Sequence, residues 1–237
     1  RLEFYDWDSN VLTPAGKPVA ALLQVQDPTA LEISQGTSSS GPGSSGAGSL
    51  PLYEAVQLAA KQPSQLSSDN ARSGPDYFMF GNAGSSACIT VARDEAETPA
   101  ASGHCLLAGP AGTIHDLKAA LPAGVAASEG KTIVVQQGTA VMQAIPTNYG
   151  RGPRFGDPSA QYFVLHDHAA LFGDELTNPE QSKDQSGSPD VTFGFTAEGS
   201  KAFRQVTDEI AHRGNLVSGL GQTLNQHFAV ALDTQLI

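Results

Sequence analysis

The amino-acid sequence predicts an α+β fold in which a mixed or antiparallel sheet carries helices on one face. Two observations lead to this prediction. Residues 190–237 read as strand, helix and strand, because apolar residues recur at every second position, then at helical spacing, then at every second position again. Upstream, short apolar runs with strand-like alternation are separated by clusters of Gly, Pro and Ser.

The first elements are a short strand and a long irregular segment. Residues 2–7 read as a strand that places Phe4 on one face and Tyr5 on the other. Ser and Gly make up 11 of the 15 residues in segment 35–49, a composition typical of a flexible tether. We therefore expect residues 1–9 to be an end strand and residues 10–49 to be a loop and linker.

Residues 50–160 are predicted to form an inserted α+β module. Residues 53–61 carry an apolar stripe at helical spacing and are predicted to be a helix. Alternation of apolar residues predicts four short strands, with a loop of small residues between the second and the third. The predicted strands are residues 77–80, 89–92, 132–136 and 141–145. Residues 148–158 are dense in turn formers and are predicted to be a loop.

Residues 161–237 are predicted to form a C-terminal β-α-β unit. Val191, Phe193 and Phe195 alternate along one face of the first strand, and residues 228–232 alternate again in the second. Thr196 is a suitable N-cap, and Gly214 stands where the helix is expected to end. We expect both strands to belong to one sheet, with the helix packed on it through Phe203, Val206 and Ile210. The chain stops at an apolar residue without a cap or polar tail, so we expect this unit to be truncated.

The C-terminal unit resembles the head region of the first large exocytoplasmic loop of SecD, the membrane-embedded accessory subunit of the Sec protein-export machinery. The family pattern is approximately V-x-F-x-F-x-x-x-G-x-x-x-F-x-x-x-T, followed after a connection by A-[IV]-x-L-D. The matching residues are Val191, Phe193, Phe195, Gly199, Phe203, Thr207, Ala229, Val230, Leu232 and Asp233.

Two further segments extend the resemblance to roughly 80 of the 237 residues. Leu171, Gly173 and Leu176 match the preceding family pattern L-x-G-x-x-[IL]-x-x-A, in which Pro179 replaces the usual Ala. The opening LEFYDW is similar to the strand that ends the ferredoxin-like base of the family.

The resemblance implies a non-enzymatic role and a set of partners. It implies that the chain works with SecF and the Sec channel, grips unfolded preprotein on the exocytoplasmic side, and belongs to a parent protein embedded in the cell membrane by helices outside this sequence. The preprotein surface itself is unknown, and the candidate positions lie in two glycine-rich segments. These positions are Asn148, Gly150, Gly152 and Gly156, then Gly214, Gly219 and Gly221.

The charge of the chain argues against nucleic acid as a partner. Thirteen basic and 24 acidic residues give a formal net charge of −11, and binding to a phosphate backbone needs an excess of positive charge. The segment from Gly41 to Gly46 fits the dinucleotide pattern GxGxxG, but no buried strand precedes it. We therefore expect no cofactor.

Cys88 and Cys105 are the two cysteines, and no zinc-type spacing surrounds either of them. In an oxidising compartment they most simply form a disulfide. Two alternatives stay open, namely free thiols and a catalytic Cys105 next to His104.

His166, His168 and Asp174 form the metal candidate of the sequence, because two histidines two residues apart share one face of a strand. The competing interpretation is a solvated turn, and we expect no metal. An extracytoplasmic metal-binding protein or hydrolase that uses His166 and His168 is the alternative function. Asp6, Asp8, Asp190 and Asp233 do not define a catalytic carboxylate pair by their spacing.

Overall fold

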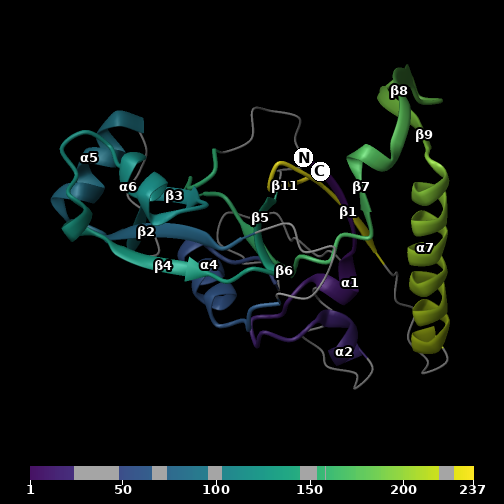
Figure 1. Cartoon of the computed structure of the whole chain (residues 1–237), viewed down its shortest axis with the longest axis horizontal. Helices are drawn as coiled ribbons and strands as arrows, with labels where there is room; N and C mark the ends of the chain where they lie inside the picture. The colour runs from purple at the N-terminus through teal and green to yellow at the C-terminus, as the bar shows by residue number, and fades with distance from the viewer. Residues whose placement is uncertain (24–47, 66–73, 96–102, 145–153, 158, 219–226) are drawn as a thin grey trace.

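Strands from distant parts of the chain build the largest sheet, which has the order β6-β5-β11-β10-β1-β7 (Figure 1). Its strands are β1 (Leu2–Asp6), β5 (Thr139–Ala144), β6 (Tyr162–His166), β7 (Leu171–Phe172), β10 (Phe228–Leu232) and β11 (Gln235–Leu236). β11 runs parallel to β5 and the other neighbours are antiparallel, so the sheet is mixed. The computed structural model describes residues 1–23, 48–65, 74–95, 103–144, 154–157, 159–218 and 227–237.

Strand β1 lies between β10 and β7, and side chains on both of its faces are buried. It pairs with β10 in a register that places Leu2 opposite Leu232 and Phe4 opposite Val230. Tyr5 points to the other face, where it joins a core that includes Met142 and Leu165. We call the face that carries Phe4 the outer face, and the face that carries Tyr5 the inner face.

The strand ends one residue earlier than the sequence predicts, because a short helix starts directly after it. Trp7 opens α1 (Trp7–Asn10), and the carboxylate of Asp6 caps this helix by accepting the Ser9 N–H at 3.3 Å. A second short helix, α2 (Val19–Leu23), follows. Residues 24–47, which hold most of the Ser/Gly-rich segment and its GxGxxG match, lie outside the described residues.

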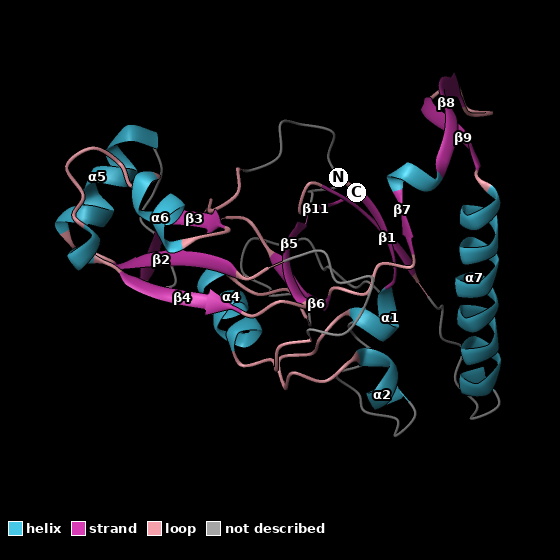
Figure 2. Cartoon of the chain, viewed as in Figure 1, coloured by secondary structure: helices cyan, strands magenta, loops and turns pink. Residues whose placement is uncertain are grey.

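A three-stranded antiparallel sheet with the order β3-β2-β4 lies at the opposite end of the molecule from α7 (Figure 2). Its elements are β2 (Asp76–Asn82), β3 (His104–Ala111) and β4 (Lys131–Val135), with helices α4 (Leu52–Ala60), α5 (Ser86–Glu95) and α6 (Ile114–Ala119). Phe78 and Phe80 of β2 pack with α4, whereas Met79 packs in a separate cluster with residues of α5 and α6. Helices therefore contact both faces of this sheet, not one face as predicted, and the α+β class is confirmed.

Helix α4 joins the two larger sheets through a shared core. Ala55 and Val56 of α4 pack with Phe78 of the three-stranded sheet and with Val141 and Tyr162 of the six-stranded sheet. Strand β5 lies within the range 50–160 that the sequence assigns to an inserted module. In the structure this strand pairs with β6 and β11.

Two elements of the middle region differ from the prediction. Residues 89–92 are not a strand but part of α5, because the Ser85 hydroxyl accepts the Cys88 N–H at 3.2 Å and caps a helix there. Residues 104–111, predicted to lie in a loop, form β3. Gly109 fits this strand because a side chain at its Cβ would lie 2.6 Å from the Tyr77 carbonyl oxygen.

The C-terminal unit contains a separate ribbon and the longest helix. Strands β8 (Leu176–Lys183) and β9 (Pro189–Phe195) pair with each other, and α7 (Ala197–Ser218) follows. The prediction that the strands at 191–195 and 228–232 share one sheet is wrong, because β1 and β11 already occupy both edges of β10. The helix starts after Thr196, whose hydroxyl accepts the Gly199 N–H at 3.0 Å, and continues past Gly214.

Two short 3₁₀ helices, η1 (Ala127–Glu129) and η2 (Gly173–Glu175), complete the described elements. Among the described helices, none combines the length and the apolar composition that a membrane span requires.

Candidate functional site

Strand β9 presents an open edge and an apolar surface. Within the described residues its one strand neighbour is β8, so the backbone groups along its other edge pair with no strand. Val191 and Phe193 lie on one face of β9 with 58% and 38% of their surfaces exposed. An open edge with apolar side chains is a suitable template for an additional extended chain.

Five phenylalanines connect β9 and α7 to the outer face of the six-stranded sheet, and we call them the phenylalanine cluster. The members are Phe4, Phe193, Phe195, Phe203 and Phe228. Each aromatic ring contacts two others, with centroid separations from 4.9 Å to 6.2 Å, so the five contacts form a closed cycle. Separations of this size are typical of favourable aromatic pairs.

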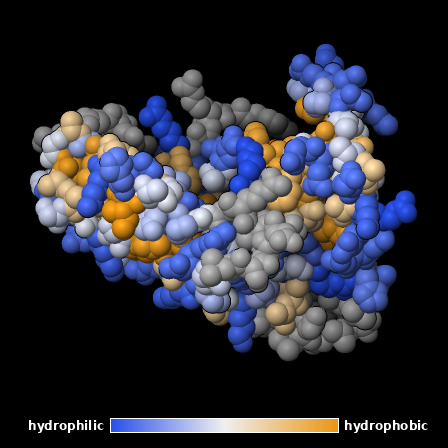
Figure 3. All heavy atoms as spheres, viewed as in Figure 1, coloured by the Kyte–Doolittle hydropathy of each residue, from blue (hydrophilic) through white to orange (hydrophobic). Residues whose placement is uncertain are grey.

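The cluster is only partly covered. Phe4 is buried at 4% exposure, whereas Phe195, Phe203 and Phe228 are half-buried. Leu232, further along the outer face, keeps 44% of its surface exposed. Apolar side chains consequently reach the surface between the sheet and α7 (Figure 3).

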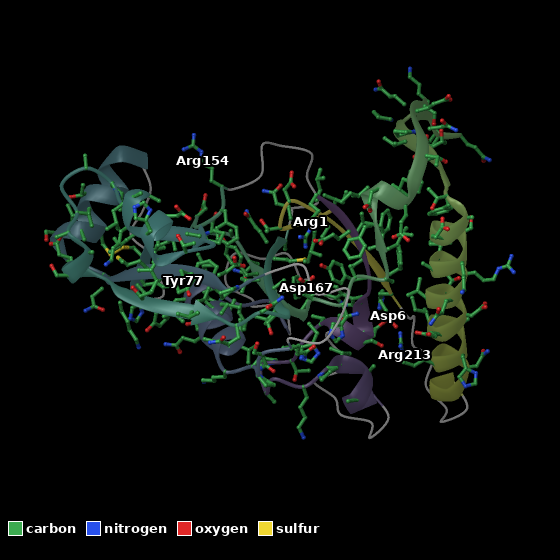
Figure 4. All side chains as sticks on the ribbon, in the orientation of Figure 1. Arg1, Asp6, Tyr77, Arg154, Asp167 and Arg213 are labelled. Atoms are coloured by element: carbon green, nitrogen blue, oxygen red, sulfur yellow. A yellow bond between two sulfur atoms is a disulfide. The ribbon has the colours of Figure 1, made fainter. Side chains whose placement is uncertain are left out.

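An ion pair fastens the C-terminal half of α7 to the end of β1. The guanidinium of Arg213 donates to both carboxylate oxygens of Asp6, at 2.8 Å and 2.5 Å, and to the Ser9 hydroxyl at 2.7 Å (Figure 4). The two side chains are 13% and 9% exposed. A planar two-pronged pair that is largely shielded from water is more strongly fixed than a surface ion pair.

A buried carboxylate of α1 holds the start of β10. Asp8 is fully buried, and its Oδ2 accepts the backbone N–H of His227 at 2.8 Å. The ring Nδ1 of His227 lies 3.4 Å from the same oxygen. The short helix α1 thus binds the chain just after α7 as well as α7 itself.

A family model of the SecDF P1 head subdomain matches residues 148–237, the part of the chain that contains β9, α7 and β10. This part of the chain is therefore similar to the SecDF P1 head subdomain. The resemblance of the C-terminal unit to the SecD head region is thereby confirmed. Neither the curated proteins nor the solved structures contain a match to the chain.

The structure describes only part of the glycine-rich segments that the sequence proposes for preprotein binding. Asn148, Gly150, Gly152, Gly219 and Gly221 lie outside the described residues.

The two described glycines of this set do not come together at one surface. Gly156 donates its N–H to the Tyr162 hydroxyl at 2.7 Å, and a Cβ there would lie 2.8 Å from Leu106 of β3. Gly214 is a residue of α7. Gly156 therefore packs beside the three-stranded sheet, whereas Gly214 belongs to α7.

The two histidines of the metal candidate lie near each other, and the described part of the chain brings no third potential ligand to them. His166 ends β6 and His168 is exposed in the turn that follows, with ring centroids 6.0 Å apart. Burial lowers the pKa of His166, and the neighbouring His168 lowers it further. Asp174 is exposed in η2, and the described residues contain no group of three potential metal ligands.

Cys88 of α5 and Cys105 of β3 form a disulfide with their Cα atoms 5.8 Å apart. Both sulfurs face Gly81, where a Cβ would lie 3.0 Å from Cys88 Sγ and 3.3 Å from Cys105 Sγ. His104 stacks on Tyr53 with ring centroids 3.6 Å apart. The thiol of Cys105 is thus bonded to sulfur, and the His104 ring packs against an aromatic side chain.

The four aspartates considered as a carboxylate pair have separate surroundings. Asp6 binds Arg213 and Asp8 binds His227, as described above. Asp233 pairs with the amino group of Arg1, and Asp190 is exposed and accepts the Val191 N–H at 2.8 Å.

A buried acidic network on the inner face escaped the sequence interpretation. The Tyr5 hydroxyl lies 2.9 Å from Asp167 Oδ1 and 3.2 Å from Glu3 Oε2, and all three residues are buried. Burial and the two carboxylates raise the pKa of Tyr5 above its ordinary value. No motif predicts this network, because Asp167 is 162 positions away from Tyr5 in the chain.

Arg213 was also missed, although the sequence contained a signal for it. Phe203, Val206 and Ile210 form a helical stripe, and the same spacing continues to Arg213. The sequence predicts that the helix ends near Gly214, so the stripe was followed only as far as Ile210.

Proposed function

We propose that this chain is part of the exocytoplasmic domain of a SecD-like subunit and that its head engages unfolded preprotein during export. In this proposal it works with SecF and the Sec channel, and the proton motive force acts through membrane helices of the parent protein to help complete export. The role is non-enzymatic. The family match over residues 148–237 supports the assignment to the translocase.

The observation that carries preprotein binding is the open edge of β9. An unfolded polypeptide can add to such an edge through main-chain hydrogen bonds, which do not depend on its sequence. Strand β10, the other C-terminal strand of the head, lies between β1 and β11 and has no open edge. The exposed Val191 and Phe193 provide apolar contacts beside the edge of β9.

Binding through this edge is expected to be weak. A main-chain ladder of a few residues gains little beyond the entropy lost when a flexible chain is ordered. Weak binding suits a transport protein, because the cargo has to be released.

Site-specific photo-crosslinking in the full-length subunit tests this proposal. A photoreactive residue at Val191 is expected to crosslink to a stalled export substrate. The matched control is the same probe at Ile89, an apolar residue of α5 that is 45% exposed, close to the 58% of Val191. Equal crosslinking at the two positions, or none at either, contradicts binding at β9.

A further inference from the structure

We propose that α7 covers an apolar binding face and that the Arg213–Asp6 pair determines how often this face is open. The ligand of the face is a stretch of unfolded polypeptide that carries aromatic or aliphatic side chains together with Lys or Arg. This inference rests on the proposed function and adds to it a side-chain site, a preferred cargo chemistry and a control.

The helix is fixed at two places. Near its start, Gly199 packs so closely that a Cβ there would lie 2.6 Å from the Glu175 carbonyl oxygen. Phe203 stacks on Phe195 at 4.9 Å in the next turn. Near its end, Arg213 grips Asp6 and Ser9. The helix is thus held by close apolar packing near its start and by an ion pair near its end.

The surface beneath the helix is suited to apolar side chains. Phe4 and Phe228 contact each other at 5.6 Å on the outer face, and Val230 pairs with Phe4 in the ladder. Phe193 and Leu232 are 38% and 44% exposed on either side. Aromatic and aliphatic side chains that already reach water gain from contact with further apolar groups.

The negative charge of the elements that carry this face favours a basic cargo. Residues 173–218, which span η2, the β8–β9 ribbon and α7, contain eight acidic and four basic residues, a net charge of −4. Arg213 is one of the four basic residues, and it is already paired with Asp6. The acidic excess of these elements favours polypeptide segments that combine apolar and basic residues.

Opening the helix requires that the Arg213–Asp6 pair separate. The apparent affinity of a site that is accessible only part of the time is reduced by the accessible fraction. Weakening the pair therefore raises the affinity for the apolar cargo, whereas a residue that merely stabilised the fold would lower it.

The experiment measures peptide binding and amide hydrogen exchange in the full chain. The probes are two fluorescent unstructured peptides, one containing Phe, Leu and Lys and the other with each Phe and Leu replaced by Ser. Arg213→Ala is expected to bind the first peptide about threefold tighter or more, because the open fraction rises. In this variant the amide hydrogens of α7 are also expected to exchange faster than in the wild type. The second peptide is expected to show no gain.

Arg204→Ala is the matched control, since Arg204 is an exposed arginine of the same helix. It is expected to change neither binding nor exchange. Asp6→Asn is the second variant that weakens the Arg213–Asp6 pair. Its amide oxygen keeps the cap of α1, while the negative charge of the pair is removed. It is expected to behave like Arg213→Ala, and it stands in for that variant if Arg213→Ala does not fold.

Three outcomes overturn the inference. If Arg213→Ala and Asp6→Asn leave the amide hydrogen exchange of α7 unchanged, the Arg213–Asp6 pair does not hold the helix closed. If exchange rises but affinity for the apolar peptide does not, the face beneath is not a binding site. If the wild type binds both peptides equally, polypeptide binding at β9 stands and only the side-chain site fails, whereas failure to bind either peptide removes the proposed function itself.

Discussion

Asp76 opens β2 with a half-buried carboxyl group beside the acidic network of the inner face. Burial raises the pKa of Asp76 above its ordinary value of 3.8, and the Asp167 carboxylate raises it further. The folded protein therefore holds the Asp76 proton more tightly than the unfolded chain. Stability contributed by this proton is present at low pH and is lost as the pH rises through and above 3.8.

Asp76→Asn is accordingly expected to raise the melting temperature at neutral pH, because the amide avoids burying an ionised group. Below pH 3.8, where the carboxyl is protonated in both states, the gain is expected to shrink. Thermal unfolding across this pH range checks both statements. Asp208→Asn, a change at an exposed position of α7, is the control and is expected to have no effect. A gain that is independent of pH would point to a cause other than ionisation.

Phe203 carries much of the packing of α7. Its ring stacks on Phe195 at 4.9 Å and meets Phe228 edge-on at 5.8 Å. Phe203→Ala is expected to lower the free energy of unfolding by about 2–3 kcal/mol, below the value for a fully buried Phe because the residue is half-buried. Urea unfolding measures the loss.

Phe193→Ala is the comparison for Phe203→Ala, because Phe193 belongs to the same cluster with 38% of its surface exposed. It is expected to cost clearly less. Equal losses for the two variants would show that the cluster acts as one unit, not as a buried and an exposed part.

At the scale of residues, sequence reasoning found side chains with local periodicity and missed those whose partners are remote. The alternation of Val191 and Phe193 was visible in the sequence, and both lie on one face of β9. The pairing of Arg213 with Asp6, and of Tyr5 with Asp167, depends on which elements come together. Spacing along the chain contains no information of that kind.

The disulfide joins Cys88 of α5 to Cys105 of β3, which is 17 positions later in the chain. Replacing both cysteines by alanine is expected to lower the free energy of unfolding by about 3 kcal/mol in the chain-entropy account of a loop of this length. Thiol titration of the unfolded, non-reduced protein is expected to find no free thiol. Two reactive thiols would contradict the pairing, and reductant is expected to have no effect on the alanine variant.

Errors at the scale of elements came from short segments. The run Ile89–Thr90–Val91 favours a strand by composition, yet a capped helix with Ala87 and Cys88 turned inward forms there. Strand β3 was hidden by its Gly and Pro, and its pairing with β2 shows shifts in register. Helices α4 and α7, with longer apolar stripes, lie close to the predicted positions.

The assignment of strands to sheets was the largest error at this scale. Alternation identified β9 and β10 as strands, but it does not state which strands pair. The two edges of β10 are taken by β1 from the start of the chain and by β11 from its end. No local pattern predicts that competition, because it is decided by residues outside the β-α-β unit.

For the whole molecule, the resemblance to SecD and the α+β class could both be predicted. The family match begins at residue 148, but the sheet of the head also takes in β1 and β5 from earlier in the chain. Family resemblance in the C-terminal part therefore describes its motif and not the whole sheet into which the motif folds.

The position of β1 has a consequence for the order in which the protein folds. Leu2 pairs with Leu232, so β1 is synthesised well before its partner β10. Pairings between such distant segments are slow to form, because a long loop has to close before any contact rewards it. Until β10 is made, one edge of β1 lacks its partner, and an unpaired strand edge is prone to aggregate or to need a chaperone. A domain proposed to hold unfolded polypeptide thus itself stays incompletely folded until its last strands are made.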